Sequence, residues 1–394
     1  VPKEEVPISH VTNGVHTLTW LEPNLRELFT QYLGDNWVND ISNPKTWKKL
    51  DKIPNAELWK IHQENKKKLI QIVRENKRAQ LERNGASPYE IMELENMLDP
   101  NVLTIGFARR FATYKRANLI FRDIERIKRI LGNPDMPLQI IFAGKAHPAD
   151  RPGQEIIKNI VDVSNMPDFK GKVIMLENYN MSVARYMLHG VDIWMNNPRR
   201  PLEASGTSGQ KAAINGAINF SILDGWWIEG YKNNSGWSIG KNEYYSSLNH
   251  QDNVDSDSIY TTLEKSIMPL YYSTDTSGIP NEWVEKMGTA NKHRLTSALQ
   301  NRPIIYMGGG STYSQLRKAV GAFSDVHIVD DEFWSGIQIE NVGDMYPVLN
   351  TALGLSVGET DDNIEIHSIS DLWSENANMY ERSYESVDYN LMDV

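Results

Sequence analysis

Hydrophobic and polar positions alternate along this chain in two distinct patterns, and the change between them falls near Asn101. From there onward, short apolar runs rich in β-branched residues are separated by segments whose apolar residues recur at helical spacing. Strands that alternate with helices predict an α/β fold, in which helices cover both faces of a parallel sheet. The expected strands are 102–107, 138–143, 173–176, 192–195 and 218–223, and the expected helices are 118–131, 154–163, 181–188 and 211–216.

The region before this alternation predicts helices alone. Residues 56–83 form one long, highly charged pattern with an apolar stripe, and Asn84-Gly85 is a typical end for such a helix. Ser87-Pro88 then begins a further short helix. The run Lys66-Lys67-Lys68 lies inside the long helix, and we interpret it as part of a solvent-exposed face.

The last quarter of the chain differs in charge from the rest. Residues 305–394 hold 3 Lys/Arg against 16 Asp/Glu, whereas the first 304 residues hold 38 against 35. So sharp a change indicates a domain boundary or a join between unrelated segments. We therefore expect a mostly helical connecting segment over 1–100, an α/β domain over 101–290 and a separate acidic α/β tail over 291–394.

The tail contains one recognisable pattern, Pro303-Ile-Ile-Tyr-Met-Gly-Gly-Gly-Ser311, which predicts a strand that runs into a glycine turn. A helix is expected to follow over 313–320. This order can bind a nucleotide phosphate, and it faintly resembles sugar-kinase, Hsp70 and actin-like ATPases. A tight connection between a strand and a helix is the more common meaning of such a turn, so both interpretations stay open.

Composition excludes several classes of site. The 394 residues include no cysteine, and the nine histidines are scattered, so we expect neither disulfides nor a structural metal. No apolar run is long enough to cross a membrane, and the N-terminus does not have the pattern of a signal peptide. We therefore expect a cytoplasmic protein. The net charge of −10 comes almost wholly from the acidic tail, where it argues against nucleic acid as a partner, and we expect no nucleic-acid partner.

Chemically rich loops follow the expected strands. In a parallel α/β sheet the carboxyl ends of the strands meet at one edge, which is where ligands gather. Four cations, Arg109, Arg110, Lys115 and Arg116, follow the first expected strand. Arginine offers planar bidentate contacts and lysine a mobile point charge, so this group is a candidate anion clamp. A solvated or carboxylate-bound basic cluster is the alternative.

The segment 197–216, NPRRPLEASGTSGQKAAING, is the most informative stretch. It places Glu203, then a glycine- and hydroxyl-rich turn, and then Lys211 at the start of a helical pattern. Backbone N–H groups at such a turn favour an anion, and phosphate is the usual one. Lys211 could act there as a charge or as an amine that forms an imine. An ordinary capped helix after a polar loop would give the same pattern.

These residues also resemble a known family. Glu203-Ala-Ser-Gly-Thr-Ser-Gly-Gln-Lys211, together with Leu223-Asp224-Gly225, is similar to the cofactor segment of the α-glucan (glycogen, starch and maltodextrin) phosphorylases. Gly144-Lys-Ala146, Glu177-Asn-Tyr179 and the stretch Thr12–Trp20 match the same family in the same order. The resemblance extends from about residue 12 to about residue 283. It implies a Rossmann-like domain of the GT-B type.

The resemblance also implies roles for single residues. Lys211 would hold pyridoxal 5′-phosphate (PLP) as a Schiff base, and the other cofactor-binding residues would be Lys145, Tyr179 and Thr207. Arg110 and Lys115 would hold the substrate phosphate. The glucosyl unit and that phosphate would meet Glu203, Ser205, Gly206 and Thr207. The chain departs from the family at Ala112, Asn180 and Gln210, where many members carry histidine, arginine and methionine.

The family's reaction is phosphorolysis of an α-1,4-glucan, which releases α-D-glucose 1-phosphate with retained configuration. The cofactor phosphate relays a proton to inorganic phosphate, so Lys211 would be an anchor and not the acid. In the family the stretch like Thr12–Trp20 follows an entire N-terminal domain, so we expect a fragment with little activity alone. The expected partners are glucan, inorganic phosphate and that missing domain, and a homodimer is one assembly to consider.

Two alternatives to a phosphorylase stay open. One is a nucleotide-sugar glycosyltransferase such as a glycogen or starch synthase, which shares the fold and a basic pair. The lysine in SGTSGQK argues against it. The other is a non-enzymatic fragment that binds glucan.

Overall fold

The computed structural model describes residues 12–39, 44–232, 234–243, 245 and 247–288, together with the backbone of 304–306 and 326–328. Its strands and helices divide into two units. The first contains β1–β6 and the helices α1–α12, and the second contains β7 and β8. The candidate site lies entirely in the first unit.

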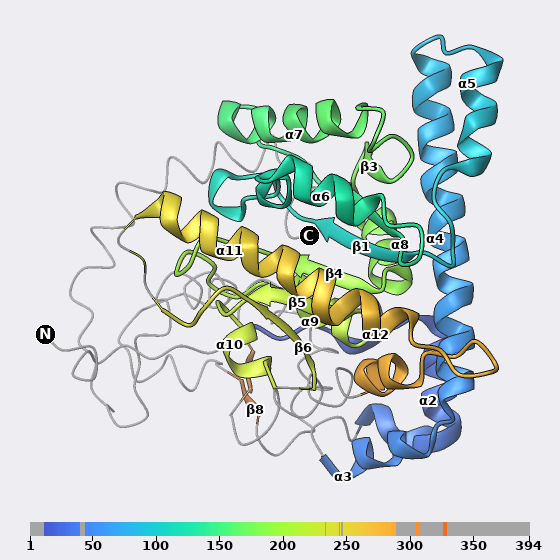
Figure 1. The fold of residues 1–394 in the computed structure, drawn as a ribbon. Helices are drawn as coiled ribbons and strands as arrows, with labels where there is room; N and C mark the ends of the chain where they lie inside the picture. Colours follow the sequence, from blue (N-terminus) through green and yellow to red (C-terminus); the bar gives the residue numbers. More distant parts are fainter. Residues whose placement is uncertain are drawn as a thin grey trace, which may run out of the picture. The chain divides into compact units, whose positions relative to one another are not determined.

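Six parallel strands in the order β3-β2-β1-β4-β5-β6 form the sheet of the first unit (Figure 1). The order reverses between β1 and β4, which is the switch point of a Rossmann-like sheet. The predicted parallel α/β fold is therefore confirmed. The strands are β1 Leu103–Ala108, β2 Leu138–Ala143, β3 Val173–Leu176, β4 Ile193–Asn196, β5 Ile218–Ile222 and β6 Gly236–Ile239.

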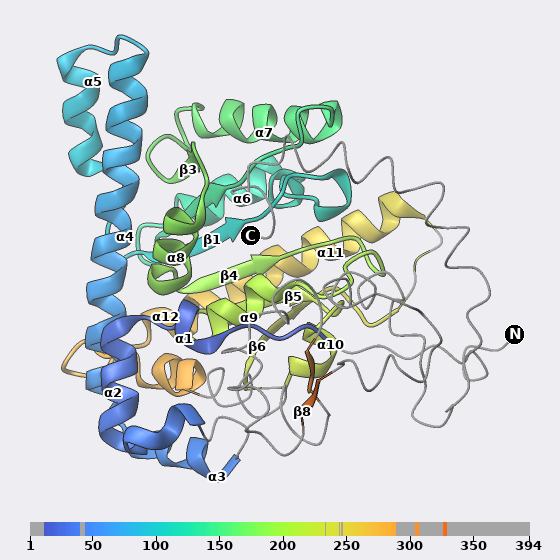
Figure 2. The ribbon, with the colours of Figure 1, turned by 180° about the vertical axis from the view of Figure 1, so that it is seen from behind.

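Helices cover both faces of this sheet, as Figure 1 and the reverse view in Figure 2 show. On one face lie α6 Ile124–Leu131, α7 Arg151–Ser164, α11 Leu248–Thr262 and α12 Met268–Tyr272, with the π-helical turn η7 Leu263–Ile267 between the last two. On the other lie α1 Thr17–Trp20, α2 Pro23–Leu33, α4 Asn55–Arg83, α8 Met181–Gly190 and α9 Thr207–Ala213. The shorter elements are η2 Asp35–Asn39, α3 Pro44–Trp47, η3 Lys48–Lys52, α5 Pro88–Met92, η4 Glu93–Asn96, η5 Thr113–Lys115, η6 Leu119–Phe121 and α10 Trp227–Gly230.

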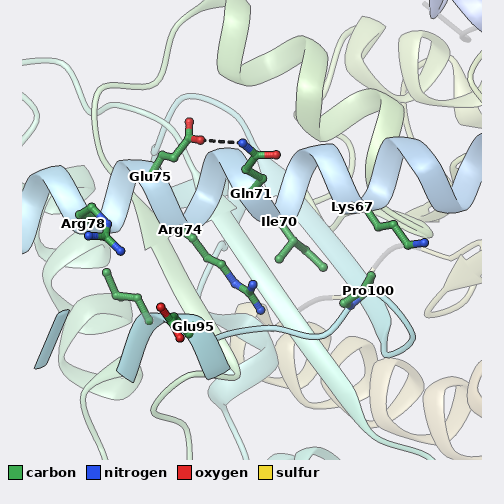
Figure 3. Close-up of a pocket in the computed structure, with 9 residues that line it drawn as sticks. Lys67, Ile70, Gln71, Arg74, Glu75, Arg78, Glu95 and Pro100 are labelled. Atoms are coloured by element: carbon green, nitrogen blue, oxygen red, sulfur yellow. Dashed lines mark hydrogen bonds between the residues drawn. The ribbon is translucent and has the colours of Figure 1, made fainter. Parts of the chain in front are cut away.

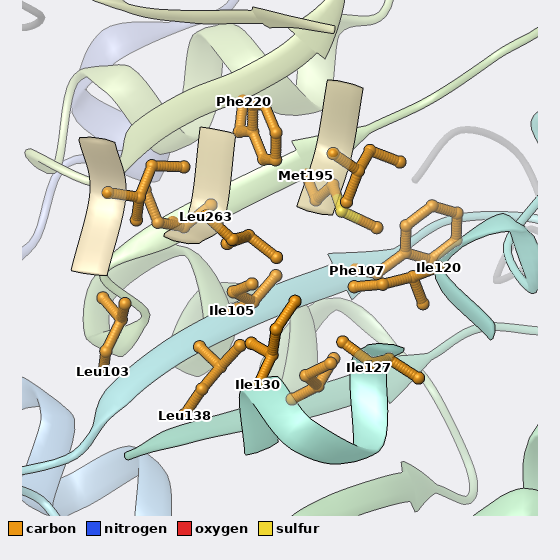
Figure 4. Close-up of a cluster of buried hydrophobic side chains, with 14 of the residues drawn as sticks. Leu103, Ile105, Phe107, Ile120, Ile127, Ile130, Leu138, Met195, Phe220 and Leu263 are labelled. Carbon is orange, nitrogen blue, oxygen red and sulfur yellow. The ribbon is translucent and has the colours of Figure 1, made fainter. Parts of the chain in front are cut away.

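The two cores follow from the period-2 alternation of each strand. Ile140 and Phe142 of β2 are buried in the first core, drawn in part in Figure 4, while Ile141 and Ala143 are buried in the second. Because both faces of the strands are buried, strands β1 to β5 appear in the sequence as mainly apolar runs. This is why β1 to β5 could be predicted from the sequence.

The long charged helix begins at Asn55 and ends at Arg83, as its pattern predicts. The second predicted helix is α5, which begins with a capping box between Ser87 and Glu90. The expectation of a solvated lysine run was wrong at Lys66, whose side chain is fully buried. Its Nζ lies 2.5 Å from Oδ2 of Asp192, directly before β4, so the charge is compensated inside the protein.

Two further predictions of secondary structure need correction, and one strand was missed. The helix expected over 211–216 spans Thr207–Ala213, so the glycine-rich turn ends four residues earlier than expected. The helix expected over 118–131 is the short turn η6 followed by α6. Strand β6, Gly236–Ile239, was not predicted.

In the second unit, β7 Ile304–Tyr306 pairs in parallel with β8 Val326–Ile328. The first of these lies within the strand predicted before the glycine turn. The turn itself and the helix predicted over 313–320 lie outside the described residues.

Candidate active site

The loop after β1 places two cations on one carboxylate. Nη2 of Arg109 lies 2.7 Å from Oε2 of Glu203, and Nζ of Lys115 lies 3.5 Å from the same oxygen. All three side chains are largely buried. Residues from the loops after β1 and β4 therefore meet at the carboxyl end of the sheet, as predicted.

Arg116 holds these two loops against each other. Its backbone has a φ of 49°, in the left-handed region, which turns the chain directly after Lys115. The buried guanidinium donates to the carbonyl oxygens of Asn197 and Pro198, at 3.0 and 2.9 Å. It also pairs with Asp252 and Asp255 of α11, at 2.8 Å each. A single side chain thus fixes the position of Lys115 relative to the loop after β4.

The environment of Lys115 changes its acidity. Burial and the neighbouring charge of Arg109 lower the pKa of Lys115 to about 8, although Glu203 opposes the shift. The ammonium is therefore still the main form at neutral pH. The same charges act on Tyr114, where burial and Glu203 raise the pKa of the hydroxyl while Arg109 and Arg110 oppose this. Arg110 itself is exposed beside this group.

Two buried groups in this region have no hydrogen-bond partner in the described part of the chain. They are Nε and Nη1 of Arg109, and Oγ of Ser205. A buried guanidinium nitrogen or hydroxyl without a partner is unfavourable by itself. Both groups are suited to an anionic or hydroxylated ligand.

Asp224 shapes the loop that carries Glu203. Its carboxylate accepts hydrogen bonds from the backbone N–H groups of Glu203, at 2.9 Å, and Gly225, at 3.0 Å. The N–H of Trp226 donates to the carbonyl of Ser205 at 2.8 Å. A Cβ on Gly225 would lie 2.5 Å from that carbonyl oxygen, so only glycine fits there. Asp224 was part of the quoted motif, but its positioning role was not predicted.

Lys211 lies on α9, one helical turn after Thr207. Residues four apart share one face of a helix, so the side chains of Thr207 and Lys211 belong to the same face. Lys211 is buried, and its Nζ lies 4.0 Å from the centroid of the Trp20 ring. Asn215 fixes this contact, because its Nδ2 donates to the carbonyl oxygens of both Trp20 and Lys211, at 2.8 Å each. Trp20 was not predicted to have a role, although it ends the stretch that resembles the family.

The remaining two predicted residues lie on the neighbouring loops. Lys145 has an exposed side chain after β2, and its carbonyl accepts a hydrogen bond from the N–H of Phe111 at 2.9 Å. Tyr179 is buried after β3. Burial raises the pKa of its hydroxyl, and the charge of Arg109 opposes this, which relates Tyr179 to the cationic group after β1.

Most of the predicted residues form two groups in the structure. One contains Arg110, Lys115, Glu203 and Tyr179 near Arg109, and the other contains Lys211 and Thr207 on α9. Lys145, exposed after β2, is not in either group. Residues 203–206 connect the two groups in sequence. Trp226 and Trp227, which follow Gly225, are both buried, and their rings contact each other.

The cavity drawn in Figure 3 lies elsewhere. It has a volume of about 360 Å³ and lies along α4, where Lys67, Arg74 and Arg78 line it together with Glu75 and Glu95. None of its lining residues is a predicted site residue. Within the described ranges, no three His, Asp or Glu side chains gather as they would around a metal ion. No helix among the described residues is both long enough and apolar enough to cross a bilayer.

The strand order and the loops at the carboxyl ends define a Rossmann-like α/β domain with a group of cations at that edge. Residues 5–256 match the family model described as carbohydrate phosphorylase. This chain therefore belongs to the carbohydrate phosphorylase family, and the predicted resemblance to α-glucan phosphorylases is confirmed.

Individual relatives agree with this. The chain is 43% identical over 319 residues to a glycogen phosphorylase of Aquifex aeolicus, a match that covers 81% of this chain and 46% of that protein. It is 47% identical over 273 residues to a maltodextrin phosphorylase of Thermococcus litoralis, covering 69% of this chain and 32% of that protein. A glycogen phosphorylase of Mycobacterium tuberculosis is 40% identical over 282 residues, covering 72% and 32%. The chain thus matches 32% to 46% of the length of these relatives.

Proposed function

We propose that this chain contains the cofactor- and phosphate-binding part of an α-glucan phosphorylase, which releases α-D-glucose 1-phosphate from a glucan and inorganic phosphate. The names of the relatives support the substrate class. The observation that carries the proposal is the meeting of Arg109 and Lys115 at Glu203, beside a loop that leads into Lys211. Cations gathered beside a carboxylate are suited to a phosphorylated sugar, because they neutralise the phosphate while the carboxylate accepts from hydroxyls.

The residues present fit pyridoxal 5′-phosphate. Lys211 would anchor it from α9, and Thr207, Lys145 and Tyr179 would contact it. The buried nitrogens of Arg109 and the hydroxyl of Ser205 have no partner in the described chain, which supports a ligand that offers anionic oxygens. When bound, the cofactor would supply a phosphate group that exchanges a proton with the substrate phosphate.

The chain's own residues would then act by placement and charge. Arg110 and Lys115 would hold the substrate phosphate, and a pKa of about 8 keeps Lys115 mainly protonated at neutral pH. Glu203 would orient the sugar hydroxyls, with its backbone fixed by Asp224. Ser205, Gly206 and Thr207 would present hydroxyl and N–H groups to the glucosyl unit and the phosphate.

The whole reaction would need more than this chain. We propose that residues 1–100 connect to a second phosphorylase domain, that 101–290 form the PLP-binding domain, and that 291–394 form an acidic tail. The second domain would complete the glucan path, so the chain alone would release little or no glucose 1-phosphate. A homodimer is the assembly we would test first.

Binding of glucose 1-phosphate to the chain, measured by titration calorimetry after incubation with PLP, tests this function. We expect binding that Lys115→Ala weakens about tenfold or more, since an ion pair of this kind contributes about 1.5–3 kcal/mol. Lys158→Ala, on the exposed surface of α7, is the control and should change nothing. Binding of ADP-glucose or UDP-glucose in place of glucose 1-phosphate would contradict the proposal and favour a synthase.

A further inference from the structure

The side chain of Asn76, on the long helix α4, binds the backbone of the loop after β3. Nδ2 of Asn76 donates to the carbonyl of Glu177 at 3.2 Å, and the N–H of Glu177 donates to Oδ1 of Asn76 at 3.4 Å. A side-chain amide that pairs with both backbone groups of one residue fixes that peptide much as a neighbouring strand would. The loop backbone therefore depends on a residue about a hundred positions earlier in the chain.

Two more residues of α4 hold the side chain of the same glutamate. Gln80 donates to Oε1 of Glu177, and Nη2 of Arg83 lies 2.6 Å from its Oε2. Both side chains of the Arg83 pair are about half exposed, so this contact adds little stability by itself. Its effect is geometric, because Asn76, Gln80 and Arg83 all approach Glu177 from one helix.

The residues after Glu177 transmit this position to Tyr179. Asn178 has a φ of 55°, in the left-handed region that asparagine tolerates better than most residues, so the chain turns directly before Tyr179. Asn180 then caps α8, since its side chain accepts from the N–H of Val183 at 3.0 Å. Buried Tyr179 thus lies between two fixed points, the α4 contact and the helix cap.

Helix α4 is itself held firmly. His62 and Lys66 bind Asp192 at 2.7 and 2.5 Å, at the amino end of β4. In the same turn, α4 packs so closely on α8 that a Cβ on Gly190 would lie 2.7 Å from the carbonyl oxygen of Asn65. A helix fixed at these points provides a rigid support for the loop after β3.

We propose that Asn76 is a positioning residue, which sets Tyr179 where it contacts the phosphate group of the cofactor. This rests on the proposed function, in which Tyr179 is a cofactor contact, and on the family resemblance, in which the motif Glu177-Asn-Tyr179 lies against the cofactor phosphate. Gln80 and Arg83 assist by orienting Glu177. Asn76 touches neither substrate nor cofactor, so its effect passes through the backbone of residues 177–179.

The test compares PLP with pyridoxal, which lacks the phosphate, by equilibrium dialysis against the whole chain. Asn76→Ala should weaken PLP binding about tenfold, as expected for the loss of two backbone hydrogen bonds, and leave pyridoxal binding within about twofold. Asn76→Asp, which keeps the acceptor and loses the donor, should lie between. Gln71→Ala is the matched control, because this exposed amide of the same helix donates to Glu75, as Figure 3 shows, and not to the loop after β3 within the described residues.

Equal weakening for both compounds would show a merely structural role and overturn the inference, and so would unchanged PLP binding. If Asn76→Ala does not fold, the same comparison of PLP affinity with pyridoxal affinity is made with Asn76→Asp. A wild-type chain that does not distinguish PLP from pyridoxal would refute the proposed function itself, and the inference with it. That outcome appears in the wild type and is therefore distinct from one that appears only in the variants.

Discussion

Replacing Asp192 by asparagine should destabilise the protein strongly, because this carboxylate compensates a lysine that is fully buried. Asp192 accepts from Nε2 of His62 at 2.7 Å, from Nζ of Lys66 at 2.5 Å and from the N–H of Thr104 at 2.7 Å. Asparagine keeps the size of the side chain but leaves the ammonium without its counter-charge. Breaking a buried ion pair in this way costs about 3–5 kcal/mol.

Lys66→Met should cost a similar amount, because it leaves the carboxylate of Asp192 with His62 as its one remaining side-chain partner. The double variant should lose less than the sum of the two, with a coupling energy of about 2–3 kcal/mol, since neither charge is then left alone. Urea unfolding followed by circular dichroism measures all three. Lys67→Met, at the exposed neighbour in the same lysine run, should stay within about 0.5 kcal/mol of the wild type.

The stability that Asp192 contributes should fall at acidic pH. Burial alone would raise the pKa of Asp192, but Lys66 and His62 outweigh it, so the pKa lies below its usual value. Its stabilisation is then complete above the unfolded pKa of about 4 and is lost as the pH falls through the lower folded pKa. Asp192→Asn should remove this part of the acid sensitivity. In the double variant, the losses of unfolding free energy caused by Asp192→Asn and Lys66→Met should not simply add. Additivity within about 0.5 kcal/mol would refute the reasoning, because it would mean that the two side chains are not coupled.

Three further predictions concern the site and its support. Glu203→Gln should lower the pKa of Lys115 below about 8, because it removes the negative charge that opposes the shift. The pH dependence of amine labelling at Lys115 measures this pKa, and an unchanged profile would contradict the pairing of Lys115 with Glu203. Gly225→Ala should abolish PLP binding or destabilise the fold by about 1–3 kcal/mol, because the residue has a φ of 53° and its Cβ would lie 2.5 Å from the carbonyl oxygen of Ser205. A variant with the melting temperature and the PLP affinity of the wild type would refute this. Gly190→Ala should lower the melting temperature, because its Cβ would lie 2.7 Å from a backbone carbonyl of α4, and thermal unfolding with an unchanged midpoint would argue against that close packing.

The sheet could be predicted because its strands are buried on both faces. Short, mainly apolar runs such as Leu138–Ala143, separated by helical patterns, are typical of strands in a parallel sheet. Strand β6 escaped prediction because Gly236–Ile239 is a short edge strand, and two of its four residues are only partly buried. Its place in the sheet depends on pairing with β5. This pairing cannot be recognised from the residues of β6 alone.

The candidate site could be located from the sequence only as far as its loops. The cations after β1 and Glu203 after β4 were predicted to face one edge, and the parallel topology brings them together. Burial of Lys66 could not be read from three consecutive lysines, because it depends on Asp192, more than a hundred residues away. The contact of Trp20 with Lys211 could not be predicted for the same reason, because it joins residues far apart in the sequence. Asn215 holds them together by its hydrogen bond to the carbonyl oxygen of Trp20.

The central claim is that Lys211 anchors the cofactor, and one measurement tests it directly. The purified chain is incubated with PLP and reduced with borohydride, and any pyridoxyl adduct is mapped by peptide mass spectrometry. We predict a single adduct on Lys211, which is buried against Trp20 and lies one turn from Thr207. Labelling spread over exposed lysines such as Lys67 and Lys158, with Lys211 unmodified, would contradict the proposed cofactor site.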